Sequence, residues 1–421
     1  MIIGSGGREH ALVWKLKQSK HVDRIYCATG NAGIAQIAKL VDTKPENISA
    51  LADFAEKNKI DLTVVGPEAP LVMGIVDEFE RKGLKIFGPN KFASQLEGSK
   101  VFSKQFMKEN SIPTSDFKVF SNANEAKNYV NEKDAPMVVK ADGLAAGKGV
   151  LVCKSNKEAL DAINKIMIEK KFGTAGDKVV IEDFIKGEEA SILAVTDGKN
   201  FVTLLPSQDH KQILNGDKGE NTGGMGAYAP APVIDEELNE RIEKEIIRPT
   251  IHGMHKNPFK GCLYVGLMIT EDGPKVLEYN CRFGDPEAQP VLSLLETDFY
   301  EILDASVNGS IDSIEVKNKE GAACCVVMTS GGYPGEYEKG KIIYGLEKVP
   351  KSAFVFHAGT ALKDGKIVTS GGRVLGVTGN GKDILSAIRT AYDGVNCINW
   401  EKEYHRTDIG EKALRTRRTN L

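Results

Sequence analysis

The first 98 residues repeat one pattern: a short apolar run, then a glycine, then a stretch with helical periodicity. The apolar runs lie at 2–3, 25–27, 62–65 and 86–87, and helical stretches lie at 50–59 and 72–82. Alternation of strand, glycine turn and helix predicts a parallel sheet covered by helices. In such sheets, ligands bind in the turns beyond the carboxyl ends of the strands. We therefore expect functional residues in the glycine turns of this α/β unit.

A different pattern begins near residue 98. Its order of strands and helices favours antiparallel sheets, an α+β arrangement. Strands are predicted at 137–140, 150–153, 179–185, 190–196, 201–205, 263–269, 275–280 and 322–328, and helices at 100–110, 158–169 and 383–393. The predicted domains are 1–98, 99–309 (with lobes of about 99–186 and 187–309) and 310–421. The fold class expected is therefore α/β and α+β combined.

Composition excludes several classes of protein. The 421 residues carry 55 Lys and Arg against 58 Asp and Glu, whereas nucleic-acid-binding chains usually show a clear basic excess. No apolar run reaches the roughly 18 residues of a membrane helix, and no basic segment precedes an apolar one as in a secretory signal. Seven cysteines without C-x-x-C spacing favour reduced thiols. We expect a cytoplasmic protein with no nucleic-acid or membrane partner, and a monomer, because no large apolar stripe is left unexplained.

The first cluster with chemical meaning is GSGGREHAL at 4–12, directly after a predicted strand. Gly4 and Gly6 fit a dinucleotide fingerprint, but Glu9 occupies the third glycine position and no acidic residue ends the second strand. A glycine turn that opens a helix offers N–H groups and a positive dipole end to an anion, and Arg8 adds a fixed charge. The alternative is a tight turn with a solvated arginine.

A glycine-rich loop, GLAAGKG at 143–149, lies between two predicted strands. It is not a Walker A loop, because Gly149 rather than Ser or Thr follows Lys148. Its N–H groups can close over phosphates, with Lys100 and Lys140 as neutralising point charges. Taken alone, such a loop is more often an ordinary hairpin.

Three polar residues alternate at the end of the predicted strand 275–280, namely Glu278, Asn280 and Arg282. Residues two apart on a strand share one face of the sheet. A carboxylate and an amide oxygen on that face suit Mg²⁺ or Mn²⁺, and an arginine beside them can stabilise a transferred phosphoryl group. Burying three polar groups is costly without a ligand, so the cluster predicts a metal and phosphate site.

Two further segments suit a small substrate: SQDHK at 207–211 and NTGGMGAY at 221–228. Adjacent glycines flanked by polar side chains favour a small anionic ligand. His210 is not expected to bind zinc, because no second ligand lies four residues on and no cysteine pair is near. The acidic segment 182–191 is compatible with an exposed turn or with an extended backbone that contacts an adenine edge.

Taken in order, these clusters resemble the ATP-grasp superfamily and, within it, the phosphoribosylamine–glycine ligase family. The most specific matches are GSGGREHAL, GPEAPL at 66–71, LEGSK at 96–100, VKADGLAAGKGV at 139–150, SQDHK, NTGGMGAY, EYNCRFGDPE at 278–287, HAGT at 357–360 and GGRVLGV at 371–377. The resemblance covers residues 1 to about 410. It implies a Rossmann-like N-terminal domain, a two-lobed ATP-grasp domain and a small C-terminal α+β domain.

The resemblance also implies an activity: ATP, glycine and 5-phosphoribosylamine give glycinamide ribonucleotide, ADP and phosphate through a glycyl phosphate intermediate. ATP and Mg²⁺ or Mn²⁺ are the cofactors implied. For the nucleotide, it implies phosphate contacts from Lys100 and Lys140, a closing loop and an adenine hinge with a ribose carboxylate. The loop residues are Gly143, Gly147, Lys148 and Gly149, and those of the hinge and ribose site are Glu182, Asp183, Phe184, Ile185 and Glu189.

For the metal, the resemblance implies Glu278 and Asn280 as ligands. Lys140, Asp209 and Arg282 are the implied catalytic residues, with Arg282 facing the acyl phosphate. Asp209 and the turn at Gly223 and Gly224 are expected to hold glycine. The remaining substrate residues, expected at phosphoribosylamine with Arg282 nearby, are Gly6, Gly7, Arg8, Glu9, Glu68 and Arg373.

The sequence departs from the family pattern at two places. Many ATP-grasp enzymes carry another metal carboxylate on the strand before Glu278, and 264–269 has none. Family members also usually begin a few residues earlier, so a shortened first strand is expected. Two alternatives remain: an ATP-grasp ligase for another carboxylate and amine, and an inactive nucleotide-binding module.

Overall fold

The N-terminal region folds as the expected parallel sheet. The computed structural model describes residues 1–145 and 148–419. The sheet has the order β3-β2-β1-β4-β5, with every pair parallel. Its strands are β1 (Ile2–Gly4), β2 (Tyr26–Thr29), β3 (Lys39–Leu40), β4 (Thr63–Val65) and β5 (Ile86–Phe87), and its helices are α1 (Gly7–Leu16), α2 (Ile48–Lys57), α3 (Glu68–Met73) and α4 (Ile75–Arg81). The helix expected at 72–82 is divided, because Gly74 has the left-handed φ of 100°. β3 was not predicted, because its two residues are exposed and carry no apolar run.

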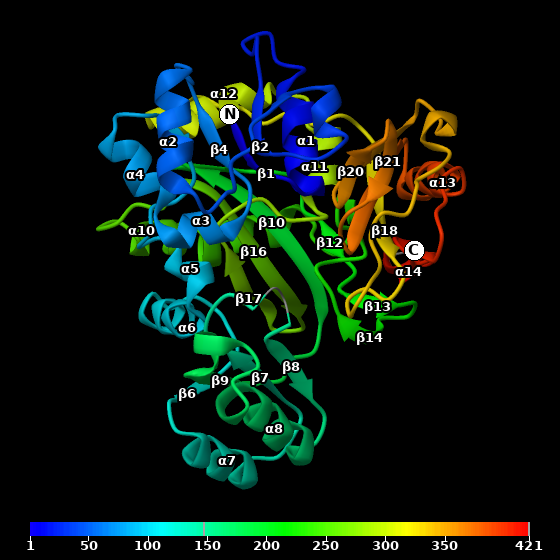
Figure 1. Ribbon diagram of the computed structural model, residues 1–421. Coiled ribbons are helices and arrows are strands. Elements are labelled where there is room, and N and C mark those ends of the chain that lie inside the picture. Colours follow the sequence, from blue (N-terminus) through cyan, green and yellow to red (C-terminus); the bar gives the residue numbers. More distant parts are fainter. Residues whose placement is uncertain (146–147, 420–421) are drawn as a thin grey trace.

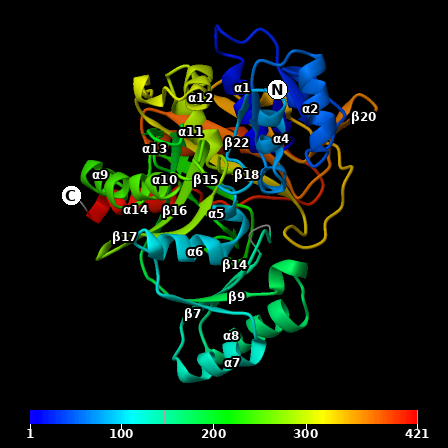
Figure 2. The same cartoon turned by 90° about the vertical axis from the view of Figure 1, so that its left-hand side faces the viewer.

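A small lobe follows, and it projects from the rest of the molecule (Figures 1 and 2). Its antiparallel sheet has the order β6-β9-β7-β8. The strands are β6 (Phe117–Phe120), β7 (Met137–Ala141), β8 (Val150–Cys153) and β9 (Val179–Asp183), and the covering helices are α7 (Ala123–Glu132) and α8 (Asn156–Ile163). The core of this lobe draws only on its own residues, from Ala126 to Ile181. A lobe with a separate core can move as a unit.

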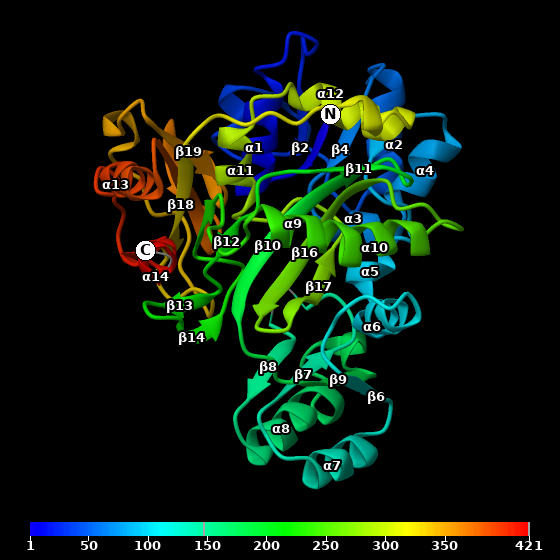
Figure 3. The same cartoon turned by 180° about the vertical axis from the view of Figure 1, so that it is seen from behind.

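The second lobe is built on the antiparallel sheet β11-β10-β16-β17. Its strands are β11 (Phe201–Thr203), β10 (Glu188–Thr196), β16 (Gly261–Thr270) and β17 (Gly273–Asn280). Helices α9 (Glu236–Ile242) and α10 (Arg248–Gly253) cross one face of this sheet, as Figure 3 shows. Helices α5 (Gln95–Gly98) and α6 (Lys100–Glu109) lead into the small lobe, and α11 (Ala288–Leu294) and α12 (Phe299–Asn308) follow β17. Two apolar clusters each combine residues of this lobe and of the N-terminal sheet.

The third sheet crosses the predicted boundary near residue 309, which itself stays a prediction. Its path is β12-β15-β18-β22-β19, with β23 paired to β18. The strands are β12 (Gln208–Asp209), β15 (Gly226–Ala229), β18 (Ala322–Ser330), β19 (Ala353–His357), β22 (Arg373–Gly381) and β23 (Glu403–Tyr404), with helices α13 (Ile384–Val395) and α14 (Glu411–Thr419). Two hairpins form separate two-stranded sheets, β13 (Gln212–Leu214) with β14 (Lys218–Asn221) and β20 (Thr360–Lys363) with β21 (Lys366–Thr369). β12 and β15, which were not predicted, bring SQDHK and NTGGMGAY onto the C-terminal sheet.

The predicted fold class is confirmed, since a parallel sheet, a two-lobed middle and an α+β C-terminal region are all present. All eight strands predicted after residue 98 are found at or within a few residues of their expected bounds. Within residues 1–145 and 148–419, no helix has the length and apolar character to cross a bilayer.

Candidate active site

Three buried charged side chains meet where α6 packs against the sheet of the small lobe. Lys140 on β7 and Lys104 on α6 each lie 2.8 Å from a different oxygen of Glu182 on β9. Burial disfavours ionised Glu182, but the two lysines outweigh it and hold its pKa below the usual value. Burial lowers the pKa of Lys104 to about 8. The Lys140 ammonium also donates to the Leu277 carbonyl at 3.1 Å, so it already reaches the second lobe.

The glycine-rich loop (143–149) begins beside Lys100, the other lysine expected to contact the phosphates. Lys100 Nζ donates to the Gly143 carbonyl at 2.9 Å, and the Asp142 carboxylate accepts from the Val101 N–H at 3.1 Å. Gly143 has a φ of 129°, a backbone conformation that residues other than glycine rarely adopt. Lys148 donates to the Pro334 carbonyl of the C-terminal region at 3.0 Å. The expected loop residue Gly147 lies outside the described residues.

The expected hinge residues lie where β9 ends and the chain crosses to β10. Phe184 is exposed there, and Ile185 is half-buried. The carboxylate of Asp183 pairs with Lys133. The Glu182 and Asp183 side chains therefore each contact lysine ammonium groups of the protein.

Four cationic side chains act on the Glu278 carboxylate. Burial opposes its ionisation, but Lys211, Lys140, Lys100 and Arg282 hold its pKa below the usual value. It pairs across the sheet with Gly266 of β16, where an added Cβ would lie 3.3 Å from the Glu278 Cγ. A larger residue at Gly266 would therefore crowd the Glu278 side chain. Four cations about one carboxylate are suited to a polyanion such as a triphosphate.

Asn280 and Arg282 continue the same face. Arg282 donates to the Asn280 Oδ1 and lies 3.2 Å from Glu97 Oε1, and its Nε lies 3.5 Å from Glu68 Oε2. Burial acts against the charge on Arg282, but Glu97 and Glu68 raise its pKa above the usual value. Glu278 and Asn280 thus offer hard oxygen atoms on one strand, the donor type that Mg²⁺ and Mn²⁺ prefer. The donor set fits a divalent cation bound together with a polyphosphate.

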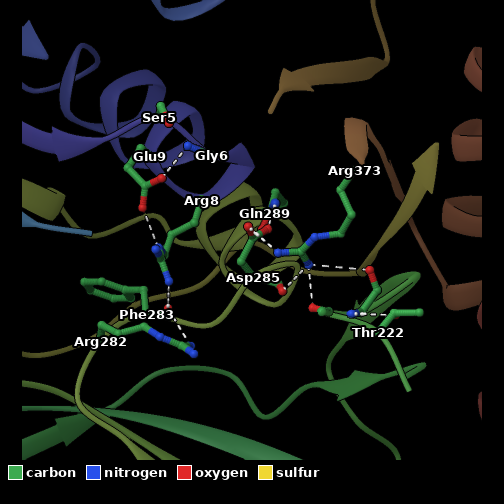
Figure 4. A network of polar contacts seen from close by, with 12 residues as sticks. Ser5, Gly6, Arg8, Glu9, Thr222, Arg282, Phe283, Asp285, Gln289 and Arg373 are labelled. Atoms are coloured by element: carbon green, nitrogen blue, oxygen red, sulfur yellow. Dashed lines mark hydrogen bonds and ion pairs between the residues drawn. The ribbon is translucent and has the colours of Figure 1, made fainter. Parts of the chain in front are cut away.

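The first glycine turn is organised by Glu9, as Figure 4 shows. Glu9 accepts from the Gly6 N–H at 2.5 Å and pairs with Arg8 at 2.5 Å. A Cβ at Gly66 would lie only 2.1 Å from the Glu9 carboxylate, so the turn requires glycine there. Arg8 also donates to the Phe283 carbonyl at 3.2 Å. The solvated arginine considered as an alternative is therefore excluded, because Arg8 is buried and bonded.

Arg373 joins the C-terminal sheet to the second lobe in the same view (Figure 4). Its guanidinium donates to the carbonyl and the carboxylate of Asp285 at 2.6 and 3.0 Å, and to the Gly223 carbonyl at 2.5 Å. The Gly223 N–H donates to the Tyr333 hydroxyl at 3.1 Å. Gly224 has a φ of 111°, which favours glycine, and a Cβ at Gly223 would lie 2.9 Å from the Arg373 guanidinium carbon. Arg373 therefore contacts the glycine turn that the sequence assigned separately.

Asp209, at the end of β12, lies close to Lys211 and Glu189. Lys211 is 2.7 Å from Glu189, the residue expected at ribose. Burial raises the pKa of Asp209 to about 7, although Lys211 pulls it down. His210 is oriented differently: it is buried near Tyr228, and burial lowers its pKa to about 3.

A cavity of about 360 Å³ lies between the N-terminal and C-terminal regions. Glycine turns from both sides form its wall, so backbone groups rather than bulky side chains face it. Its lining residues are Ser5, Gly6, Gly30, Asn31, Asp285, Ala358, Gly359, Thr360, Ser370, Gly371 and Arg373. Asn31 bridges the two sides, donating to the carbonyls of Ser5 and His357 at 2.8 and 2.7 Å. Of the expected substrate residues, Gly6 and Arg373 line this cavity, whereas Gly7, Arg8, Glu9 and Glu68 do not.

The sequence interpretation missed several charged residues of the site. Lys211 was part of a quoted motif but received no role, and Glu97 was quoted only within LEGSK. Lys104 and Asp285 likewise had no assigned role. A signal was available for Lys211, Glu97 and Asp285, because each lies within three residues of an assigned residue in a quoted motif. Their partners, however, come from distant segments that only the fold brings together.

Comparisons with known proteins agree with this geometry. Models of the phosphoribosylglycinamide synthetase N domain, ATP-grasp (A) domain and C domain match residues 1–97, 98–288 and 323–412. A phosphoribosylamine–glycine ligase of Rhodopirellula baltica is 50% identical over 99% of this chain and 98% of its own. The chain belongs to the phosphoribosylglycinamide synthetase family.

Solved structures of other proteins share the fold of this chain. The phosphoribosylamine–glycine ligase of Thermotoga maritima superposes with a TM-score of 0.85 at 36% identity, covering 97% of this chain and 99% of that one. A biotin carboxylase of Campylobacter jejuni has a TM-score of 0.75 at 15% identity, over 98% of this chain and 94% of that one, which shows the shared ATP-grasp fold. Membership of the synthetase family makes this chain an ATP-grasp ligase and excludes the inactive module.

Proposed function

We propose that this chain ligates glycine to 5-phosphoribosylamine, giving glycinamide ribonucleotide, ADP and phosphate. The observation that carries the proposal is that Lys140 of the small lobe donates to the Leu277 carbonyl beside Glu278 at 3.1 Å, and that three further cations act on this carboxylate, in a chain of this synthetase family. Such a group neutralises a triphosphate and the charge that develops when its γ-phosphoryl group is transferred. The product belongs to purine biosynthesis.

ATP binds where the small lobe meets the second lobe. Lys100 and Lys140 contact the phosphates, and the loop with Gly143, Lys148 and Gly149 closes over them. The carboxylates of Glu182 and Asp183 are already paired with lysines, so they are not available to adenine. The backbone N–H and C=O groups of 182–185 contact adenine instead. Glu189 exchanges its ion pair with Lys211 for the ribose hydroxyls. Glu278 and Asn280 hold Mg²⁺ or Mn²⁺, which supplies charge neutralisation and alignment of the phosphates when bound.

The chemistry has two stages. A glycine carboxylate oxygen attacks the γ-phosphorus and ADP leaves, forming glycyl phosphate; the amine of phosphoribosylamine then attacks the acyl carbon and phosphate leaves. Asp209, with the turn at Gly223 and Gly224, holds the glycine ammonium. Arg282 faces the acyl phosphate. This chemistry needs positioning and charge neutralisation rather than a nucleophilic triad.

Phosphoribosylamine occupies the cavity between the N-terminal and C-terminal regions. The cavity's volume of about 360 Å³ suits a small polar ligand, and its glycine turns let backbone N–H groups approach a phosphate. Gly6 and Arg373 contact the ligand, while Arg8, Glu9 and Gly7 shape the turn that bounds it. Glu68 lies beside Arg282 at the acyl end. The enzyme works as a cytoplasmic monomer.

Labelled glycine tests the proposal. Glycine carrying ¹⁸O in its carboxylate is incubated with ATP, Mg²⁺ and fresh phosphoribosylamine. The glycyl phosphate route transfers one labelled oxygen to inorganic phosphate and leaves the other in the product amide. Phosphate without label would overturn the route. Product formed only with a different amine would instead support the alternative ATP-grasp ligase.

A further inference from the structure

We propose that Glu97 is a positioning residue for the ligation: it fixes the Arg282 guanidinium through the turn that carries it. The inference rests on the proposed function, because it assigns Arg282 to the acyl phosphate. It concerns a residue for which neither the motifs nor the comparisons give a role.

Glu97 contacts the Arg282 turn (residues 281–285) at three atoms. One of its oxygens accepts from the Cys281 N–H at 2.8 Å and from the Cys281 thiol at 3.0 Å. The other lies 3.2 Å from the Arg282 Nη2. One carboxylate therefore fixes both the backbone at the base of Arg282 and the end of its side chain. Contact at two points restrains a long side chain far more than an ion pair alone.

The contacts of Arg282 show which edge is left for a substrate. Its Nη1 donates to the Phe283 carbonyl and its Nη2 to Asn280, both at 3.2 Å. Its buried Nε faces the Glu68 carboxylate at 3.5 Å but makes no hydrogen bond within the described residues. A buried N–H group held only by this longer ion pair can take a closer acceptor from a ligand. Glu97 thus holds the Nη2 edge so that the Nε–H edge stays oriented toward the reacting group.

The same turn is held by two other charged side chains from distant segments. Arg8 donates to the Phe283 carbonyl at 3.2 Å, and Arg373 donates to the Asp285 carbonyl at 2.6 Å (Figure 4). Glu97 alone of the three also contacts Arg282 itself. It lies three residues before the phosphate lysine Lys100, at the junction between the N-terminal region and α6. Its position therefore couples the placement of Arg282 to the segment that carries a phosphate contact.

A double-mutant cycle tests the proposal in the full-length enzyme. Glu97→Gln removes the charge but keeps the shape, and it should lower kcat on the order of 100-fold, the scale of a misplaced catalytic group. The KM for ATP should change less than about twofold, because the contacts that bind ATP before the reaction are unchanged. In an Arg282→Lys background, Glu97→Gln should cost less than about threefold, since the two residues act as one unit. Equal losses in both backgrounds would overturn the proposal.

The matched control is Asp217→Asn. Asp217 lies 3.0 Å from the buried Arg406, which keeps its second carboxylate, Asp408, at 2.7 Å. This variant should leave kcat unchanged and combine additively with Arg282→Lys. A crystal structure of Glu97→Gln adds a readout independent of activity: the Arg282 guanidinium should be displaced while β17 stays in place, and an unmoved guanidinium would contradict the proposal.

Failure of the proposal is distinguishable from failure of the proposed function. Wild-type enzyme that releases no ADP with glycine and phosphoribosylamine overturns the function. Active wild-type enzyme with a fully active Glu97→Gln variant overturns only the positioning role. If Glu97→Gln does not fold, Glu97→Asp serves in its place. It keeps the charge but shortens the reach, so it should lower kcat with little change in the KM for ATP. A variant with lower thermal stability, a lower kcat and a raised KM for every substrate would show a structural role instead.

Discussion

The Lys211 ammonium lies 2.7 Å from the Glu189 carboxylate, which joins the SQDHK segment to the start of β10. Lys211 also acts on the pKa values of Asp209 and Glu278. One lysine therefore lies between the expected ribose, glycine and metal residues. Its charge balances three carboxylates before substrates arrive. This relationship makes the ionisation of Asp209 sensitive to ligands and to pH.

The affinity for glycine should depend on pH near neutrality. Burial raises the pKa of Asp209 to about 7, so the carboxylate is protonated below that pH and ionised above it. Only the ionised form attracts the glycine ammonium. The reciprocal of the glycine KM should therefore rise about tenfold per pH unit below pH 7 and level off above it. Steady-state kinetics from pH 5.5 to 8.5 measure this. Asp209→Asn should bind glycine weakly at every pH, and an unchanged pH profile in that variant would refute the assignment.

Removing the carboxylate at the centre of the cations should abolish turnover but not folding. Glu278→Ala should lower kcat on the order of 10²- to 10³-fold, because metal and phosphate lose their common ligand. The variant should fold with a lower thermal unfolding temperature, because Glu278 is half-buried and its loss leaves four cations without the carboxylate that balances them. Glu271→Gln, an exposed change at the turn before β17, is the control and should be fully active. Wild-type turnover in Glu278→Ala would disprove the metal assignment.

Glu182 should prove important for stability. Its replacement by glutamine leaves Lys104 and Lys140 buried and facing one another without their common partner. Breaking a buried pair from one side costs about 3–5 kcal/mol. We expect a fall of that size in the free energy of unfolding, measured by urea denaturation. Adding Lys104→Met to the Glu182→Gln variant should restore part of the lost free energy of unfolding, because it removes one of the two unpaired buried charges. Strict additivity of the two changes would argue against direct coupling.

Filling the interdomain cavity should weaken phosphoribosylamine binding alone. Ser5 is exposed and lines the cavity, so Ser5→Phe puts a large ring there without disturbing the core. The KM for phosphoribosylamine should rise at least about tenfold, a loss of 1.4 kcal/mol, while those for ATP and glycine stay unchanged. Ser121→Phe, exposed on the small lobe, is the matched control. If both variants keep the wild-type KM, the ligand binds elsewhere.

The sequence was sufficient for elements with strong local signals. Alternating apolar runs and glycine turns identified the parallel sheet, and the strand predicted at 275–280 is found as β17, ending at Asn280. β12 and β15 were missed, because short, glycine-rich segments have no apolar periodicity and become strands only through pairing with β18. The same limit holds for the site. Nothing local could show that Arg8, Glu97 and Arg373 meet at one turn, since their contacts span 88 to 275 residues.

Coupled ADP release tests the central claim most directly. Purified enzyme is supplied with ATP, Mg²⁺ and glycine, with and without freshly made phosphoribosylamine. The account predicts sustained ADP release only when glycine and phosphoribosylamine are both present, with glycinamide ribonucleotide formed in equal amount. Sustained ADP release without glycine and phosphoribosylamine would contradict the account. No ADP release when both are present would contradict it as well.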